Sequence, residues 1–396
     1  MATTADRTER RLVLVVGAVV FVDTMFYAAI APLLPGLANE LHLSKLSAGA
    51  MTAAYPAGTL IGSIPGGLFA ARFGPKLTVC AGLTLLACST LAFGLVNSAL
   101  LLDIARFAEG VGGAFSWAGG LAWIIAEAPL ERRGALMGGA LGAAIVGALF
   151  GPVIGTLAAG IGRAPAFSVV VLVSVVLIVE ALRQPSPEST TQQGLRELVA
   201  ALRDRGVIVG MWLVALPAIA SGALSVLGPL RLHRLGATAA AIGATYLVAA
   251  ALEALVSPAI GRLSDRRGRL LPLRFGLAAT TGVLLCFTLP TDVVLLAAVV
   301  VAIASALGIF WAPAMAMLSD AADTSGLDQG LAAGLMNLAW ASGQVVGSGA
   351  GGAVAKATGD GLVMAVTAGL CALTLVALPW RSLAVFGRRA EVGSGS

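Results

Sequence analysis

Charged side chains are scarce in this sequence, and their scarcity indicates its class. Asp, Glu, Lys and Arg make up 11% of the 396 residues, whereas hydrophobic residues make up 58%. A soluble domain carries about 25% charged residues, because water must solvate its surface. Most of the surface of this chain must therefore face lipid, which predicts an integral membrane protein with the bilayer as its main partner.

Metal-binding and nucleophilic residue patterns are also missing. The four cysteines lie inside apolar runs, form no CxxC pair and have no histidine close by in the sequence. They are expected to be small core residues, so neither a metal site nor a cofactor is predicted. The basic residues form no tract, which argues against a nucleic-acid partner. Without a nucleophile signature or a G-x-x-x-x-G-K-[ST] loop, an enzyme and an ATP-driven pump are both disfavoured.

Long apolar runs take the place of these patterns. A helix that crosses a bilayer needs about 20 apolar residues. The first apolar run continues past the length of a signal peptide, so it is counted as a membrane helix. Residues 391–396 are set aside as a tail or cloning remnant. Twelve stretches qualify as spans: Leu12–Gly36, Ala48–Ala70, Leu77–Val96, Ala99–Ala126, Gly134–Gly160, Phe167–Leu182, Val207–Leu230, Ala239–Ile260, Leu270–Leu289, Val293–Leu318, Gly330–Ala357 and Gly361–Trp380.

The distribution of Lys and Arg predicts the orientation. Cytoplasmic loops carry the excess of these residues in membrane proteins. With both termini in the cytoplasm, most of the 25 basic residues fall on the inner side. Only five fall on the outer side: Lys45, Arg163, Arg231, Arg234 and Lys356. The chain is therefore expected in the cell membrane, as a monomer with cytoplasmic termini.

Two patterns recur about half a chain apart and divide the sequence. Gly67-x-x-x-x-Arg72-x-Gly74 is followed by a related segment at 261–269, and Gly147-x-x-x-Gly151 by Gly343-x-x-x-Gly347. The repeat predicts an N-terminal six-helix half over 1–182 and a C-terminal half over 207–390, the architecture of carriers that rock around a midplane site. Between them, the apolar spacing in 183–206 predicts a short amphipathic helix on the inner membrane surface. A merely solvated loop is the alternative.

Several of these segments resemble the major facilitator superfamily. Residues 261–269 match its loop motif G-x-L-x-D-R-x-G-R, and 102–110 resemble its fourth-helix motif with a buried Arg. Gly147, Gly151, Pro152 and Gly155 resemble the fifth-helix motif of its antiporters. Residues 22–35 and 350–356 look like drug/proton antiporters and vesicular amine transporters. The resemblance implies an all-α membrane fold of twelve helices in two pseudo-symmetric halves.

The resemblance also implies a set of gating residues. Arg72, Asp265 and Arg266 would form the inner gate, and the glycines of the fifth helix would seal the cavity during the return step. The glycine face also suits ordinary tight helix packing. The first-half loop has Ala71 where the family has Asp, and Pro75 where it has a basic residue. The latch formed by this loop is therefore expected to be weaker, or to be supplied by other residues.

Ionisable residues inside the spans are the candidates for proton coupling, because such groups are costly in a membrane and usually functional. Asp23 and Arg106 both lie near mid-bilayer by residue count, and Glu109 shares the helix face of Arg106. Glu253 lies in the eighth span, nearer the inner side. We expect Asp23 and Arg106 to be coupled. A purely structural ion pair of Arg106 within its own helix is the alternative.

Aromatic and amide side chains near the middle of spans are the candidates for substrate binding. Membrane Trp normally lies at the interfaces, so a mid-span Trp is unusual. A cavity with aromatic walls and one acid suits a lipophilic cation. Core filler is the alternative for each of the candidates, which are Phe26, Tyr27, Trp117, Asn337, Trp340 and Gln344.

These observations favour a secondary active transporter that exports lipophilic or cationic small molecules in exchange for protons. A carrier of the same fold for a sugar, peptide, amino acid or other metabolite is the alternative, as is a uniporter without proton coupling. A transport-inactive sensor is disfavoured, because the sequence shows no large soluble segment through which to signal.

Overall fold

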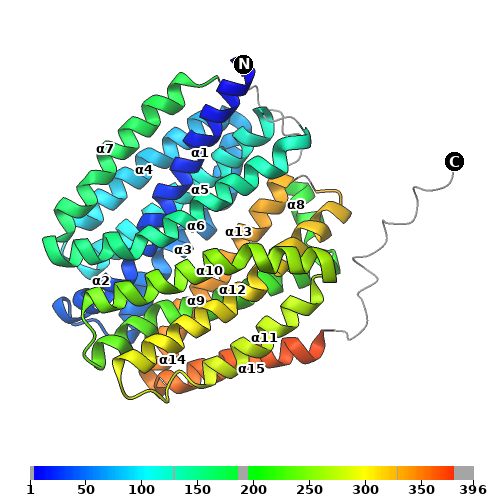
Figure 1. Cartoon of the computed structure of the whole chain (residues 1–396). Coiled ribbons are helices and arrows are strands. Elements are labelled where there is room, and N and C mark those ends of the chain that lie inside the picture. The colour runs from blue at the N-terminus through cyan, green and yellow to red at the C-terminus, as the bar shows by residue number, and fades with distance from the viewer. Residues whose placement is uncertain (1–3, 128–129, 186–194, 328, 379–396) are drawn as a thin grey trace.

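The computed structural model describes residues 4–127, 130–185, 195–327 and 329–378, and its regular elements there are helices (Figure 1). The N-terminal helices are α1 (Thr4–Ala28), α2 (Ile30–Glu40), α3 (Lys45–Phe73), α4 (Pro75–Leu95), α5 (Ala99–Glu127), α6 (Leu130–Ile161) and α7 (Arg163–Arg183). The remaining elements are α8 (Leu195–Ala201), α9 (Arg205–Arg234), α10 (Ala239–Arg267), α11 (Leu270–Leu285), α12 (Val293–Thr324), α13 (Gln329–Val345), the π-helical turn η1 (Val346–Ala350), α14 (Gly351–Thr358) and α15 (Asp360–Ala377).

The helices follow the twelve predicted spans, with three local differences. Eight helical segments of the described residues are long and apolar enough to cross a membrane, and α3, α5, α11 and the run α13–η1–α14 occupy the other four predicted spans. Helix α11, which occupies the ninth predicted span, ends at Leu285 and not at Leu289. The first span is interrupted at Ala29, and the eleventh contains the π-helical turn. Residues 391–396, and residues 186–194 of the predicted linker, lie outside the described residues.

Pro32 explains the interruption of the first span. A proline has no backbone N–H, and its ring collides with the carbonyl four residues earlier, which here belongs to Ala28. The helix therefore breaks one residue later, and the Ala29 N–H turns to the carbonyl of Phe26 at 3.3 Å. The break faces the interior of the N-terminal half, since Ala29 and Ile30 are buried.

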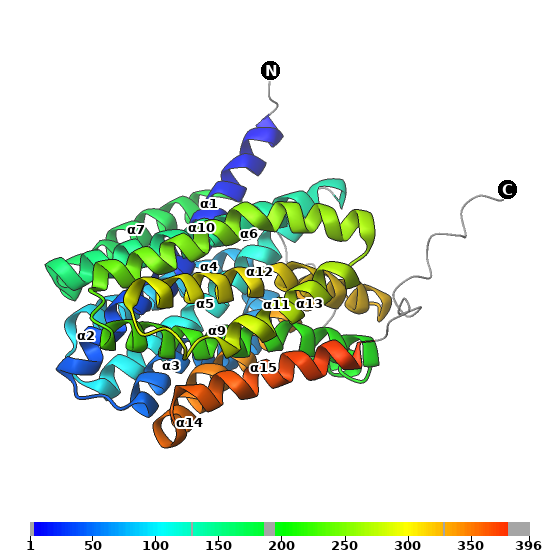
Figure 2. The ribbon, with the colours of Figure 1, turned by 60° about the horizontal axis from the view of Figure 1, so that its bottom comes forward.

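Helices α1–α7 pack among themselves and α9–α15 among themselves, and the two groups lie side by side (Figures 1 and 2). The glycine faces produce the same packing in both. A Cβ at Gly147 or Gly155 of α6 would lie within 3 Å of a carbonyl oxygen of the first span. A Cβ at Gly343 or Gly347 would do the same with α9. The fifth span therefore packs on the first as the eleventh packs on the seventh.

The loops after the second and eighth spans are also alike. Each contains one glycine in the left-handed region, with φ of 87° at Gly74 and 82° at Gly268. Only glycine adopts such angles at little cost, so these residues allow a turn of very few residues.

The short helix α8 follows the first half, and its Leu198 and Ala201 are buried while Val199 and Leu202 are exposed.

The two halves meet mainly at one end of the molecule. We call this end the distal side. It contains the α2–α3, α9–α10 and α14–α15 turns. The opposite end, where the described chain begins and ends, is the terminal side. Helix α3 packs there on η1 and α14, and α10 packs on α2 and α6. A Cβ at Gly49 would lie 2.5 Å from the Ser348 carbonyl oxygen, and one at Gly352 would lie 2.6 Å from the Lys45 carbonyl oxygen.

A buried carboxylate adds charge to this distal contact. The Lys45 ammonium of the N-terminal half lies 2.6 Å from Asp360 Oδ1 at the start of α15. Arg234 at the end of α9 donates a hydrogen bond to the other carboxylate oxygen, and Arg231 lies 3.9 Å from it. Asp360 is 6% exposed, so the pairing is partly shielded from water.

Five glycines toward the terminal ends of these helices make no such contact with the other half. A Cβ added at any of them would have no heavy atom within 4 Å, in contrast to Gly49 and Gly352. These positions are Gly67 of α3, Gly138 and Gly142 of α6, Gly261 of α10 and Gly334 of α13. The structure therefore shows a conformation that is closed between the halves on the distal side.

Replacing Gly352 with Ala should weaken this closed conformation. The added methyl group would meet the backbone of Lys45 and Gly49, neither of which can rotate away, so α3 and α14 must separate. Such overpacking costs about 1–3 kcal/mol, enough to change the ratio of conformations about fivefold or more. Pulsed EPR distances between spin labels at the exposed distal positions Leu101 and Leu289 should lengthen.

The matched control is Gly369→Ala in α15, where a methyl group has free space. It should leave the distance distribution unchanged. Both variants need a background in which the four cysteines are replaced, because Cys88 and Cys286 are exposed. Identical distributions for Gly352→Ala and the parent protein would contradict the assignment.

Candidate functional site

Asp23 of α1 lies in the interior of the N-terminal half, and 1% of its surface is exposed. The Tyr55 hydroxyl of α3 donates a hydrogen bond of 2.8 Å to Asp23 Oδ1. The Trp117 indole of α5 donates one of 3.0 Å to Oδ2. Each carboxylate oxygen thus has one neutral donor from a different helix, so this buried acid is satisfied without an ion pair.

Close packing of α3 on α5 places Tyr55. A Cβ at Gly58 would overlap the Phe107 carbonyl, and a Cβ at Gly110 would overlap the Tyr55 carbonyl. A Cβ at Gly113 would lie 2.5 Å from Asp23 Oδ1 and 2.7 Å from the Tyr55 hydroxyl. The absence of side chains on this face of α5 therefore leaves room for the Asp23–Tyr55 hydrogen bond.

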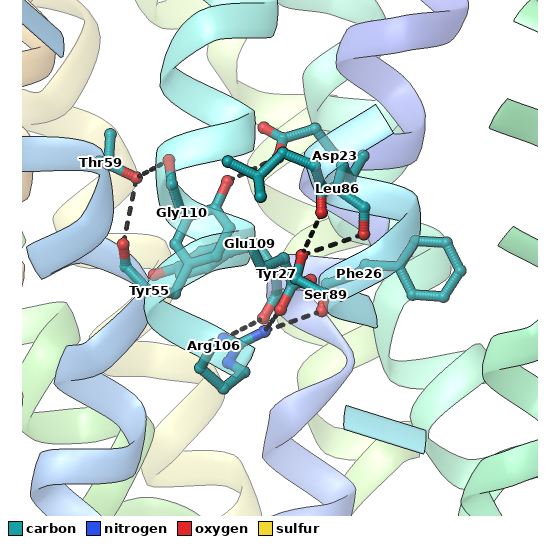
Figure 3. Close-up of polar contacts among 11 residues, drawn as sticks. Asp23, Phe26, Tyr27, Tyr55, Thr59, Leu86, Ser89, Arg106, Glu109 and Gly110 are labelled. Atoms are coloured by element: carbon teal, nitrogen blue, oxygen red, sulfur yellow. Dashed lines mark hydrogen bonds and ion pairs between the residues drawn. The ribbon is translucent and has the colours of Figure 1, made fainter. Parts of the chain in front are cut away.

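Arg106 is buried next to the break in the first span (Figure 3). Its Nη1 lies 2.9 Å from Glu109 Oε2, one turn along α5, and both side chains are 2% exposed. The guanidinium also donates to the carbonyl oxygens of Phe26 and Tyr27, at 3.4 and 3.3 Å. Its Cζ lies 5.1 Å from the centre of the Tyr55 ring. A carboxylate, two carbonyls and an aromatic face thus compensate this charge.

The structure pairs Arg106 with Glu109 and not with Asp23. The alternative reading, an ion pair of Arg106 within its own helix, describes this conformation. Tyr55 connects the two groups, since its hydroxyl binds Asp23 and its ring lies beside the guanidinium. Asp103, one turn before Arg106, has no hydrogen-bond partner for Oδ1 within the described part of the chain.

Three of the six predicted substrate-binding residues belong to one aromatic group that reaches Asp23 through Trp117 and Tyr55. Trp117 binds it directly, and the Tyr27 ring lies 4.8 Å from that of Tyr55. Trp340 of α13 meets the edge of Tyr27 at 5.5 Å between ring centres. Since α13 belongs to the C-terminal half, this aromatic contact places the acid next to the junction of the halves.

The other three predicted residues lie apart from this group. Phe26 is 4% exposed and packs on Phe167 at 5.6 Å, within the N-terminal half. Gln344 is buried and donates to the Ser221 hydroxyl at 3.0 Å, which ties α13 to α9. Asn337 is half-buried one turn before Trp340.

Glu253 lies away from the charged cluster. It is half-buried on α10, and its Cγ would lie 3.0 Å from a Cβ added at Gly308 of α12. Both helices belong to the C-terminal half, whereas Asp23 and Arg106 lie on helices of the N-terminal half. Within the described residues, no group of three His, Cys, Asp or Glu side chains is arranged to hold a metal.

The predicted gating residues fall into two places. Gly147, Gly151 and Gly155 of α6 pack on the first span, and the Pro152 carbonyl lies beside Gly243 of α10 on the distal side. On the terminal side, Arg72 is exposed, with its Cζ 5.3 Å from the centre of the Phe73 ring. Arg266 is exposed as well, and the side chain of Asp265 lies outside the described part of the structure.

Tyr55 is the member of the site that the sequence reasoning missed. A signal was present, because Tyr55 lies well inside its helix and away from the membrane interfaces that aromatic residues prefer. The same argument had selected Trp117 and Trp340.

Comparison with known proteins gives one family. The family model described as Major Facilitator Superfamily matches residues 16–327 and 222–394. Multidrug resistance protein 1 of Bacillus subtilis (strain 168) is 28% identical over 176 residues, 44% of this chain and 45% of that protein. The synaptic vesicular amine transporter of Homo sapiens is 24% identical over 308 residues, 76% of this chain and 60% of that protein. The chain thus matches less than two thirds of either relative.

A solved structure shares the fold. The crystal structure of a bacterial homolog of the human lysosomal transporter Spinster, in an inward-facing and unoccupied conformation, superposes with a TM-score of 0.76. The match covers 93% of this chain and 96% of that chain at 14% sequence identity. At this identity the similarity establishes the fold alone.

Replacing Gly155 with Ala should destabilise the site indirectly, through the packing of α6 on the first span. The methyl group would lie 2.6 Å from Pro32 Cγ and overlap the Ala29 carbonyl, next to the break that faces Arg106. We expect a loss of about 1–3 kcal/mol and an unfolding midpoint a few degrees lower in detergent. Gly160→Ala on the same helix has free space and serves as the control. Equal midpoints for the two variants would contradict the packing argument.

Proposed function

The chain belongs to the major facilitator superfamily and is a multi-pass membrane transporter, not an enzyme; on this basis we propose that it exports lipophilic or cationic small molecules in exchange for protons. The observation that carries the proposal is the environment of Asp23. A single carboxylate is buried in the first span, held by two neutral donors, and lies beside aromatic rings at the junction of the halves. Ionisable groups in such positions usually bind substrate or protons.

The surroundings of Asp23 support a cationic cargo. Tyr55 and Trp117 contact the acid, and Tyr27 and Trp340 extend this group of rings toward the C-terminal half. Aromatic rings attract cations through their faces. The names of the relatives agree with this class, since one is a multidrug resistance protein and another an amine transporter.

The charge distribution supports an orientation with the terminal side in the cytoplasm of the cell. Basic residues there include Arg72, Lys76, Arg183, Arg203, Arg205, Arg262, Arg266, Arg267 and Arg269. In that orientation, the distal side is extracellular and the conformation faces inward.

Coupling follows if a proton and a cargo cation compete for Asp23. Exclusion from water disfavours the carboxylate form, whereas the donors from Tyr55 and Trp117 favour it. The balance changes whenever the halves move and water or cargo reaches the acid. A guanidinium does not release a proton in proteins, and in this conformation the charge of Arg106 is compensated by Glu109. Proton exchange is therefore assigned to Asp23, with Arg106 and Glu109 as a fixed pair behind it.

Asp23→Asn should abolish transport driven by a proton gradient while leaving the protein folded. Asn can bind the same neighbours but cannot exchange a proton or carry charge. The measurement is cargo uptake in proteoliposomes under an imposed pH gradient. Glu180→Gln is the control, because Glu180 lies on the surface of α7 and pairs with the exposed Arg183. It should transport as the parent protein does.

Two outcomes would contradict the assignment in different ways. If Asp23→Asn still concentrates cargo against a gradient, the proton site lies elsewhere, with Glu109 and Glu253 as the next candidates. If the parent protein ignores the pH gradient with every cargo tested, the carrier is a uniporter or takes another kind of metabolite.

The acid also predicts which cargo binds. A lipophilic monocation should bind at least about tenfold more tightly than an anion of matched size, a difference of about 1.4 kcal/mol. Fluorescence binding titrations with a cationic dye and a matched anionic dye measure the preference. In Asp23→Asn the preference should disappear, and equal affinities in the parent protein would exclude a cation site at Asp23.

A further inference from the structure

We propose that Tyr55 is the positioning residue of this transporter: its hydroxyl holds the Asp23 carboxylate and thereby sets the pH at which Asp23 exchanges its proton. The inference rests on the proposed function in one respect, namely that Asp23 is the exchanging acid. It adds a residue from a second helix, α3, that carries no charge of its own.

The position of Tyr55 is fixed on three sides. Its backbone carbonyl lies against Gly110, and its ring lies 4.8 Å from the ring of Tyr27 and 5.1 Å from Arg106 Cζ. Tyr55 is 3% exposed. With the ring held in this way, the hydroxyl has little freedom to leave Asp23 Oδ1 at 2.8 Å. The hydrogen bond from Tyr55 is therefore part of the packed environment that determines the pH at which Asp23 is protonated.

Few other groups act on Asp23. On α5, Arg106 and Glu109 exert opposite electrostatic effects on it, and they are paired with each other at 2.9 Å. On α3 the titratable neighbour is Tyr55 itself. The remaining donor is Trp117, which does not titrate. Among the described residues, the Tyr55 hydroxyl is thus one of two neutral groups that stabilise the carboxylate form directly.

Removing the hydroxyl should therefore favour the protonated acid. A hydrogen bond to a charged group that is lost without replacement shifts a titration by about one to two pH units. Since the lost bond stabilised the charged form, protonation should persist to higher pH. Tyr55→Phe keeps the ring, and with it the contacts to Tyr27 and Arg106, so it removes only this bond.

Infrared difference spectroscopy of the purified full-length protein tests the proposal. The carbonyl band of a protonated carboxyl group that is missing in Asp23→Asn identifies Asp23, and its pH midpoint is read in the parent protein and in Tyr55→Phe. We expect the midpoint of Tyr55→Phe to be about one to two pH units higher. A band that appears only in Tyr55→Phe gives the same answer, because the hydroxyl then keeps Asp23 charged in the parent protein.

Tyr246→Phe is the matched control. Tyr246 is half-buried, and its hydroxyl donates to the Leu224 carbonyl at 2.9 Å within the C-terminal half. Its replacement should leave the Asp23 midpoint unchanged, which separates the loss of a hydrogen-bonded tyrosine hydroxyl in general from the loss of this one. A midpoint in Tyr55→Phe equal to that of the parent protein, or an Asp23 band absent from both, overturns the proposal.

A second variant covers the case in which Tyr55→Phe does not fold. Gly113→Ala would place a methyl group 2.5 Å from Asp23 Oδ1 and 2.7 Å from the Tyr55 hydroxyl, and should separate them. The midpoint should rise as in Tyr55→Phe, and an unchanged midpoint counts equally against the role of Tyr55. The spectra need no cargo and no gradient. If the midpoint shifts but transport ignores the pH gradient, the positioning role stands and the proposed antiport fails.

Discussion

Three ionisable groups are buried in the interior of the N-terminal half, and most of its local structure serves to accommodate them. An unpaired charge buried away from water is very costly, so each must find a partner. Arg106 finds Glu109 and two carbonyl oxygens, while Asp23 finds a phenol and an indole. These partners come from α1, α3 and α5, so the three helices must approach one another closely. The glycine faces of α3 and α5 make that approach possible.

The interruption of the first span belongs to the same arrangement. The carbonyls of Phe26 and Tyr27, which receive the guanidinium of Arg106, immediately precede the break at Ala29. A guanidinium is stabilised by carbonyl oxygens at the end of a helix, where their partial charges are least compensated. Gly155 of α6 packs on this same carbonyl turn. The antiporter-like glycine motif and the buried charge therefore meet at one point of the first span.

The sequence predicts those features that depend on local pattern and leaves open those that depend on helix rotation. Apolar length predicts the spans, and the spacing of Gly147, Gly151 and Gly155 predicts one tightly packed face. The spacing of Arg106 and Glu109 along one helix makes their pairing possible, but the choice of Glu109 over Asp23 depends on how α5 is turned against α1, which no local pattern encodes. The contact of Tyr55 with Asp23 likewise depends on the crossing of α3 and α5. Proline positions were visible, but a continuous first span was expected, because membrane helices often tolerate proline.

Comparison of the two halves shows that the position of Asp23 has no acidic counterpart in the C-terminal half. The carbonyl of Phe21 lies against Gly147 as that of Ala215 lies against Gly343, so α1 and α9 occupy matching places. Asp23 stands two residues after Phe21, and Pro217, a buried residue, stands two residues after Ala215. The C-terminal half therefore has an apolar residue where the N-terminal half has its acid.

This asymmetry bears on the movement of the halves. If both matching positions carried an acid, any rocking motion that hydrates one and buries the other would change two desolvation costs of opposite sign, and they would largely cancel. Under the proposed antiport, the whole change would fall on the one acid, Asp23, and its protonation would be linked to the motion without compensation. The contact of Trp340 with Tyr27 lies where this linkage would act, because it joins the C-terminal half to the aromatic ring that packs on Tyr55.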